Sequence, residues 1–163
     1  MVDLGCGPGR LTGHLRSLGL DVSGLDLSPG MVAVARRTCP GVAFTVGSLL
    51  TLPYADGALA GALAWYSVIH TPPDTLPEVV REVVRVVRRG APLVLAFQAG
   101  AGQPHRGERP YGHDVSLTSY RHDAERVEAL LAESGALVGT RVLREPEGFE
   151  TTRQAFLLAR RAL

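Results

Sequence analysis

Three glycines at alternate positions near the start of the chain are the residues best suited to holding a ligand. Gly5, Gly7 and Gly9 follow the apolar run Val2-Asp-Leu4 and precede a helical pattern. Glycine has no Cβ and tolerates positive φ, so such a loop turns tightly, and the next helix directs its free N–H groups at whatever binds there. The segment predicts a strand, a ligand-binding loop and a helix.

An aspartate lies where a second strand is expected to end. Residues 20–26, Leu-Asp-Val-Ser-Gly-Leu-Asp, form a short apolar run that ends in Asp26, one helix length after the glycines. In a strand-loop-helix unit of this size, a carboxylate at this place grips a nucleoside ribose. The two signals together predict a cofactor that contains a nucleoside.

The spacing of the glycines separates two classes of cofactor. The dinucleotide fingerprint G-x-G-x-x-G needs a glycine where this chain has Arg10, and the spacing here is G-x-G-x-G. With Asp3 in front, the run Asp3-Leu-Gly-Cys-Gly-Pro-Gly9 resembles the nucleotide-binding motif of class I S-adenosylmethionine-dependent methyltransferases. A nicotinamide-linked oxidoreductase is the disfavoured alternative.

This resemblance implies a fold, a cofactor and a set of contacts. The fold is a doubly wound, mostly parallel seven-stranded Rossmann-like α/β sheet with an antiparallel last strand and helices on both faces. The cofactor is S-adenosyl-L-methionine, and S-adenosyl-L-homocysteine is the product. The implied cofactor-binding residues are Asp3, Gly5, Cys6, Gly7, Gly9, Asp26, Leu27, Met31, Ser48, Leu49, Tyr66 and Ser67.

Within that set, the resemblance gives individual roles. The three glycines line the methionine part, Asp26 accepts hydrogen bonds from the ribose hydroxyls, and Leu27 and Met31 flank the adenine. Ser48 replaces the acid that usually meets the adenine amino group, so we expect a weaker contact there.

The segment Trp65-Tyr-Ser-Val-Ile-His70 follows the fourth expected strand, beside the point where the strand order reverses. Tyr66 and His70 are the predicted catalytic residues, with His70 as base or substrate contact, while Ser67 bonds the methionine end. The alternatives are that Trp65 and Tyr66 are core aromatics and that His70 is a capping or packing histidine.

Residues 98–121 form the longest stretch without a periodic pattern, and we expect an irregular segment on the substrate side. His105, Arg109 and His113 are its predicted substrate contacts, and they favour an acceptor with an acidic or phenolic oxygen. A solvated loop without function is the alternative for each of them.

The remaining pattern alternates strand and helix. Helices are expected at 10–19, at 29–37 with Ser28 as N-cap and Met31, Val34 and Ala35 facing inward, and at 76–87 and 122–134. Later strands are expected at 42–46, 59–66, 93–97, 137–143 and 154–159. His122, at a helix start, is not a catalytic candidate.

Composition limits the classes of function. At 163 residues and 45% hydrophobic, the chain fits a single domain spanning 1–163. A net charge of +1 argues against nucleic acid as a partner, no run is long enough for a membrane span, and two unpaired cysteines do not indicate a metal. We therefore expect a small-molecule acceptor, a cytoplasmic location and a monomer or homodimer. Every one of the 17 basic residues is arginine, which excludes a lysine base or Schiff-base nucleophile.

Only Met1 and Val2 precede the motif, whereas relatives of the family carry helices and most of a first strand there. The amino-terminal part is thus interpreted as truncated. The leading hypothesis is methyl transfer to an O or N atom of a small molecule. The alternative is a catalytically weak or degenerate cofactor-binding subunit.

Overall fold

The computed structural model describes residues 1–108 and 116–163. Seven strands form one sheet in the order β3-β2-β1-β4-β5-β9-β8, and β6 pairs with β7 in a separate two-stranded ribbon. The strands are β1 Val2–Leu4, β2 Ser23–Asp26, β3 Phe44–Val46, β4 Ala62–Trp65, β5 Pro92–Gln98, β6 Pro104–Glu108, β7 Ser116–Tyr120, β8 Ala136–Arg144 and β9 Gln154–Arg161. The helices are α1 Arg10–Ser17, α2 Pro29–Thr38, the 3₁₀ turn η1 Val68–His70, α3 Leu76–Val86 and α4 Ala124–Glu133.

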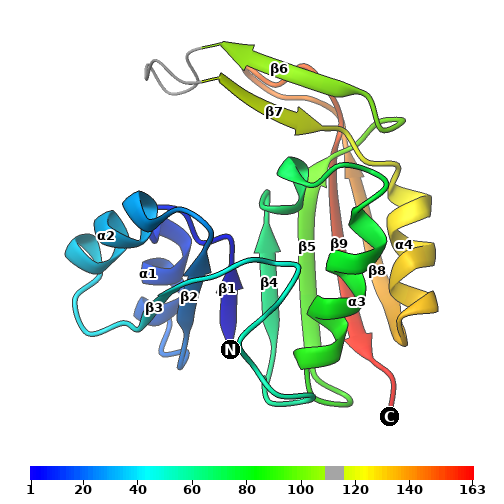
Figure 1. Ribbon diagram of the computed structural model, residues 1–163. Coiled ribbons are helices and arrows are strands. Elements are labelled where there is room, and N and C mark those ends of the chain that lie inside the picture. Colours follow the sequence, from blue (N-terminus) through cyan, green and yellow to red (C-terminus); the bar gives the residue numbers. More distant parts are fainter. Residues whose placement is uncertain (109–115) are drawn as a thin grey trace.

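The sheet has the predicted topology. Strands β1 to β5 pair in parallel, and β9 runs antiparallel between β5 and β8. The order reverses between β1 and β4, so right-handed crossovers carry α1 and α2 to one face and α3 and α4 to the other (Figure 1). The switch point is the place where doubly wound sheets bind ligands.

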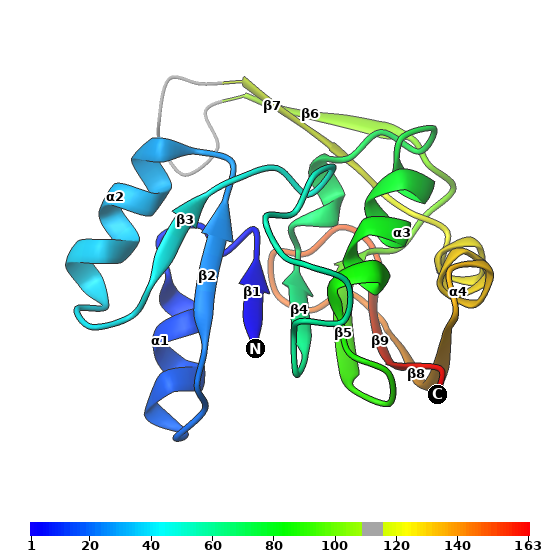
Figure 2. The same cartoon turned by 60° about the horizontal axis from the view of Figure 1, so that its bottom comes forward.

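Two apolar clusters hold the helices against the sheet. The larger one joins α3 and α4 to β1, β2, β4, β5, β8 and β9. The predicted stripe of α3 is buried throughout and consists of Leu76, Val79, Val80, Val83, Val84 and Val87. The smaller one joins α2 to the start of the chain through Cys6, Val32, Ala35 and Phe44. Figure 2 shows α1 and α2 beside β1–β3, and α3 and α4 beside the other half of the sheet. Each fully buried valine or leucine contributes about 1.5–3 kcal/mol.

The expected strands and helices are present with shifted boundaries, as in β4, which starts at Ala62 rather than Leu59. One prediction was wrong: the stretch 98–121 is not irregular throughout. It contains β6 and β7, which pair antiparallel and lie above the carboxyl end of β5 (Figure 1). Their sequences lack the apolar alternation of a half-buried strand, because they pair with each other outside the sheet.

A second correction concerns α2. Ser28 is its N-cap, accepting a hydrogen bond from Met31 N, as expected. Met31 does not face inward, since it is 43% exposed, and Val32 is buried instead. No helix in the described ranges is long and apolar enough to cross a bilayer.

Candidate functional site

The glycine loop lies at the switch point, between the end of β1 and the start of α1. Gly5, Gly7 and Gly9 all have positive φ, at 73°, 54° and 82°. A Cβ on Gly5 would lie 2.2 Å from Ser67 Cβ, and one on Gly9 would lie 3.0 Å from Ala35 Cβ, whereas a Cβ on Gly7 would meet nothing within 4 Å. Packing thus requires glycine at both ends of the loop, and its middle faces open space.

Asp26 connects this loop to the start of α2. Its Oδ2 accepts a hydrogen bond from Gly7 N and its Oδ1 accepts one from Ser28 N, both at 2.8 Å. Gly5 N and Cys6 N donate to the carbonyl of neighbouring Leu25, which holds the loop against β2. Each carboxylate oxygen has a second lone pair available for a ligand hydroxyl.

Asp3 and Cys6 lie beneath the loop. Asp3 is buried, and its Oδ2 accepts a 2.6 Å hydrogen bond from Thr12 Oγ1 of α1. Burial raises the pKa of Asp3, while the bond from Thr12 opposes that rise. Burial and the nearby Asp3 and Asp26 carboxylates raise the pKa of the Cys6 thiol to about 12, so Cys6 is a protonated packing residue and not a nucleophile.

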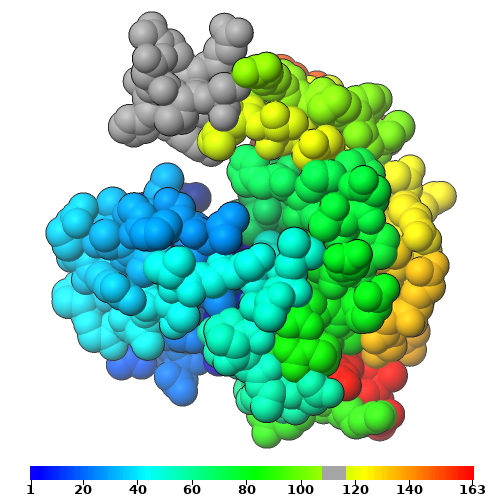
Figure 3. Space-filling view, viewed as in Figure 1, coloured from blue at the N-terminus to red at the C-terminus, as the bar shows by residue number. Residues whose placement is uncertain are grey.

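The residues after β4 face the glycine loop. Tyr66 has φ 56°, the only positive value among the described non-glycine residues, and its N–H donates to Ala96 O. The hydroxyl of Ser67 is buried beside Gly5 and has no hydrogen-bond partner. A buried polar group without a partner is rare in a folded protein, and strained backbone clusters at ligand sites. In Figure 3 the surface is notched between the blue segment that holds α2 and the green segment that holds η1.

Two histidines tie η1 to the chain around β7. His70 is exposed, and its Nδ1 donates to Thr118 O at 3.0 Å, which leaves Nε2 of the neutral ring as the basic nitrogen. His122 is buried, and its Nε2 donates to Val68 O at 3.0 Å. No local pattern in the sequence indicated this role of His122, because its partner lies 54 positions away.

The residues expected around an adenine lie at the edge of the sheet. Leu27 and Met31 are 71% and 43% exposed, so both have apolar surface to offer a ligand. Ser48 Oγ accepts from Leu50 N at 3.1 Å within its own turn, and Leu49 packs partly against the larger core cluster. His105 lies exposed on β6. Arg109 and His113 lie outside the described residues.

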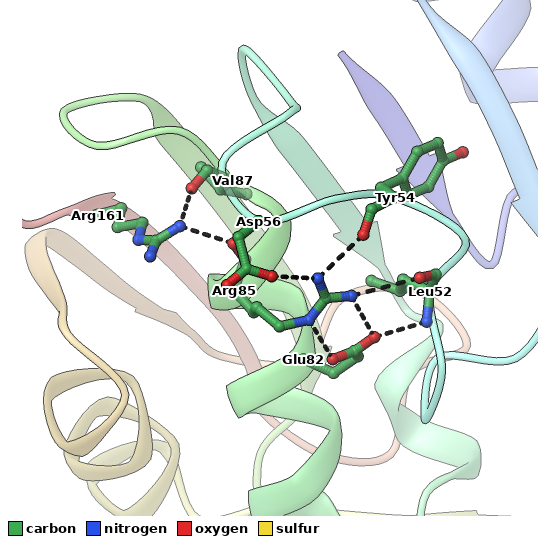
Figure 4. Close-up of polar contacts among 7 residues, drawn as sticks. All are labelled: Leu52, Tyr54, Asp56, Glu82, Arg85, Val87 and Arg161. Atoms are coloured by element: carbon green, nitrogen blue, oxygen red, sulfur yellow. Dashed lines mark hydrogen bonds and ion pairs between the residues drawn. The ribbon is translucent and has the colours of Figure 1, made fainter.

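The loop that carries Ser48 and Leu49 is clamped to α3 by a network that sequence reasoning missed (Figure 4). Arg85 donates to both carboxylate oxygens of Glu82 at 2.7 Å and to Asp56 Oδ1 at 2.6 Å. It also donates to the carbonyls of Leu52 and Tyr54. The connection from β3 to β4 thus has a fixed path without a helix of its own.

No group of three histidine, cysteine, aspartate or glutamate side chains suited to a metal ion occurs within 1–108 and 116–163. A groove of about 760 Å³ lies between β8, β9 and the end of the chain, lined by residues such as Leu137, Thr140 and Leu158. No residue of the glycine loop lines it, so it is separate from the candidate site.

The fold and this site together define a class I S-adenosylmethionine-dependent methyltransferase. A family model described as "Methyltransferase domain" matches residues 1–90, more than half of the chain, which therefore belongs to that family. The resemblance drawn from the glycine motif is confirmed, and S-adenosylmethionine is the cofactor of the family.

Individual relatives share parts of the chain. Demethylmenaquinone methyltransferase of Beutenbergia cavernae is 34% identical over 96 residues, which are 59% of this chain and 39% of that protein. Norajmaline N-methyltransferase of Rauvolfia serpentina is 31% identical over 144 residues, 84% of this chain and 45% of that protein. The chain thus spans about two fifths of the length of each.

Among solved structures, an S-adenosylmethionine-dependent methyltransferase from Methanosarcina mazei has a TM-score of 0.87 at 19% identity, covering 99% of this chain and 92% of its own. Magnesium protoporphyrin IX methyltransferase from Synechocystis, solved with bound S-adenosylmethionine, has a TM-score of 0.75 at 21% identity, with 99% and 69% covered. At these identities the likeness concerns the fold.

Proposed function

We propose that this protein transfers a methyl group from S-adenosylmethionine to an O or N atom of a small molecule. The observation that carries the proposal is the Asp26 carboxylate, which spans the glycine loop and the start of α2 at the switch point. The residues present fit the cofactor, since Gly7 has an open side and the buried Ser67 hydroxyl lacks a partner next to Gly5.

Each residue then has a role. Asp26 holds the ribose hydroxyls, Leu27 and Met31 flank the adenine with Ser48 and Leu49 at its edge, and Ser67 and the glycine loop hold the methionine end. Asp3 and Cys6 support the loop from beneath. The bound cofactor supplies an electrophilic methyl group on a positively charged sulfur.

The acceptor side is formed by Tyr66 and His70. The ring of Tyr66, placed by a strained backbone, offers a π face to a cation. His70 accepts the proton of an acceptor hydroxyl or amine at Nε2, because its Nδ1–H is held by Thr118 O. The net charge of +1 favours a small molecule over nucleic acid.

Calorimetric titration with S-adenosylmethionine and S-adenosylhomocysteine tests the proposal. We expect Asp26→Asn to weaken binding about 10- to 100-fold, because hydrogen bonds to a charged acceptor are worth about 1.5–3 kcal/mol each. Asp21→Asn, an exposed aspartate ahead of β2, is the matched control and leaves binding unchanged. Equal affinities of the two variants would contradict the proposal. Tight binding without turnover on any acceptor would favour the cofactor-binding subunit instead.

A further inference from the structure

The rings of Trp65 and Phe156 contact each other across β5, which lies between their own strands β4 and β9. The contact is at the carboxyl end of β4, where the candidate site lies. Trp65 ends β4 and pairs with Ala96 of β5, which pairs in turn with Phe156 of β9. Because Ala96 carries only a methyl group, the two rings close over it, with centroids 5.4 Å apart. Larger residues at 96 would hold them apart.

These rings lie on the sheet face that α3 and α4 do not cover. Side chains alternate along a strand, and Ala64, Leu95 and Leu157, next to the aromatic row, point into the core under α3 and α4. Trp65 and Phe156 therefore point the other way. Trp65 is 37% exposed although it is the largest apolar side chain in the protein.

Tyr66 connects this pair to the candidate site. Its ring is T-shaped against Trp65 at 5.8 Å and against Phe156 at 6.5 Å. A φ of 56° is costly for tyrosine, and here that conformation turns its ring toward the aromatic pair while Ser67, the next residue, packs on Gly5. We call Trp65, Tyr66 and Phe156 the aromatic platform. It includes Tyr66, which is itself a predicted cofactor contact, and it adjoins Ser67, the next one along the chain.

The charges beside the platform are already paired. Tyr66 lies within electrostatic range of Arg144 and Glu150. Arg144 forms ion pairs with Glu150 at 2.8 Å and Glu147 at 3.3 Å. The charge of Arg144 is thus neutralised within the chain, so Arg144 is not available to bind an anionic acceptor.

We propose that the aromatic platform binds the acceptor, and that the acceptor is a planar, uncharged aromatic ring. The proposal rests on the methyltransferase function proposed above and names its substrate class. Partly exposed rings that already pack edge-to-face and tilted accept a further flat ring in the same geometries, and paired rim charges disfavour a carboxylate. The platform then holds the ring beside the methyl donor, where its hydroxyl or amine substituent is methylated.

Phenol and cyclohexanol are matched probes, because both are uncharged at neutral pH and differ in planarity. Trp65 is the sole tryptophan of the chain, so its emission, excited at a wavelength that phenol does not absorb, reports binding at the platform itself. We expect phenol to change Trp65 emission and to bind about fivefold more tightly than cyclohexanol by calorimetry, and benzoate to bind more weakly than phenol.

Phe156→Leu removes one ring of the platform and keeps an apolar side chain, whereas Phe149→Leu changes a ring that is 98% exposed in the loop before β9. We expect the first variant to lose about fivefold in phenol affinity and the second to lose nothing, with S-adenosylhomocysteine affinity unchanged in both. Equal affinities for phenol and cyclohexanol, equal effects of the two variants, or no phenol binding would overturn the proposal. If the cofactor does not bind but the phenol pattern holds, the methyltransferase proposal fails and the platform remains an aromatic site.

Discussion

The glycine loop and the β6–β7 ribbon both lie toward the carboxyl ends of the parallel strands (Figure 1) and are held in different ways. At the glycine loop, the Asp26 carboxylate and the Leu25 carbonyl fix successive backbone N–H groups, and Gly5 has no room for a Cβ. The chain around the ribbon is tied to η1 by two imidazole N–H groups, from His70 and His122, that donate to carbonyls. The glycine loop, proposed to hold the cofactor, is therefore restricted to one conformation. The ribbon, on the proposed acceptor side, is held by a few neutral hydrogen bonds and is easier to alter.

Gly5→Ala tests the packing of the glycine loop and is expected to have the largest effect. Its Cβ would clash with Ser67 at φ 73°, so strain and overpacking together cost about 2–5 kcal/mol of unfolding free energy and cofactor binding is lost. Gly7→Ala adds only the strain of its φ, about 1–2 kcal/mol. Denaturant unfolding measures both, and equal losses would show that the contact with Ser67 does not restrict the loop.

Arg85→Leu tests whether the hydrogen bonds that hold the β3–β4 connection to α3 contribute to stability. The change removes the Arg85 hydrogen bonds to half-buried Glu82 and to the carbonyls of Leu52 and Tyr54, and it leaves Glu82 with only the bond from Leu52 N. We therefore expect the midpoint of thermal unfolding to fall by about 5–10 °C. Arg81→Leu, exposed on the same helix, is the control. Similar melting temperatures for the two variants would show that the hydrogen bonds of Arg85 do not stabilise the fold.

Two substitutions of His122 test the hydrogen bond that links the chain after β7 to η1. His122→Leu removes one of the two hydrogen bonds that Val68 O accepts, the other coming from Thr71 N, and is expected to cost about 0.5–1.5 kcal/mol, whereas His122→Gln keeps an N–H donor and costs less. An equal cost for both would mean that packing, and not the hydrogen bond, is what His122 provides.

His122 also determines the direction in which the free energy of unfolding changes with pH. Burial lowers the pKa of His122 below 6.5, so the unfolded chain takes up this proton first as the solution is acidified. Its stabilising contribution is complete above pH 6.5 and is lost as the pH falls from 6.5 to the lower value of the folded state. Unfolding measured between pH 8 and pH 5 should show a slope that His122→Gln reduces.

Of these variants, His70→Asn should change the free energy of unfolding least, while it lowers the activity. His70 is exposed, and asparagine keeps a donor near Nδ1 for Thr118 O, so the unfolding free energy should stay within about 0.5 kcal/mol. Asparagine has no basic nitrogen, so kcat should fall about 100-fold or more with an acceptor that carries a proton of high pKa. An unchanged kcat would reduce His70 to a packing role.

The sequence alone determined the class of protein. The glycines at 5, 7 and 9, the absence of glycine at 10 and the acid at 26 lie within one strand-loop-helix-strand unit, where local conformation and short spacing are enough to predict the loop. The alternation of strand and helix gave the doubly wound sheet, because periods of two and 3.6 residues are local properties of the chain. The ribbon was missed because its two strands pair only with each other and carry no such period.

Only the tertiary structure decided which residues share the site. Ser67 meets Gly5, His122 reaches Val68 and Phe156 reaches Trp65 across Ala96, and these partners are separated by roughly 50 to 90 positions in the chain. The hydrogen bond from His122, the packing of Ser67 and the stacking of Phe156 act over a few ångströms of space and leave no spacing signal in the sequence. The sequence was enough to predict the loop that we propose holds the cofactor, whereas sheet packing brought together the rings and histidines that we propose face the acceptor.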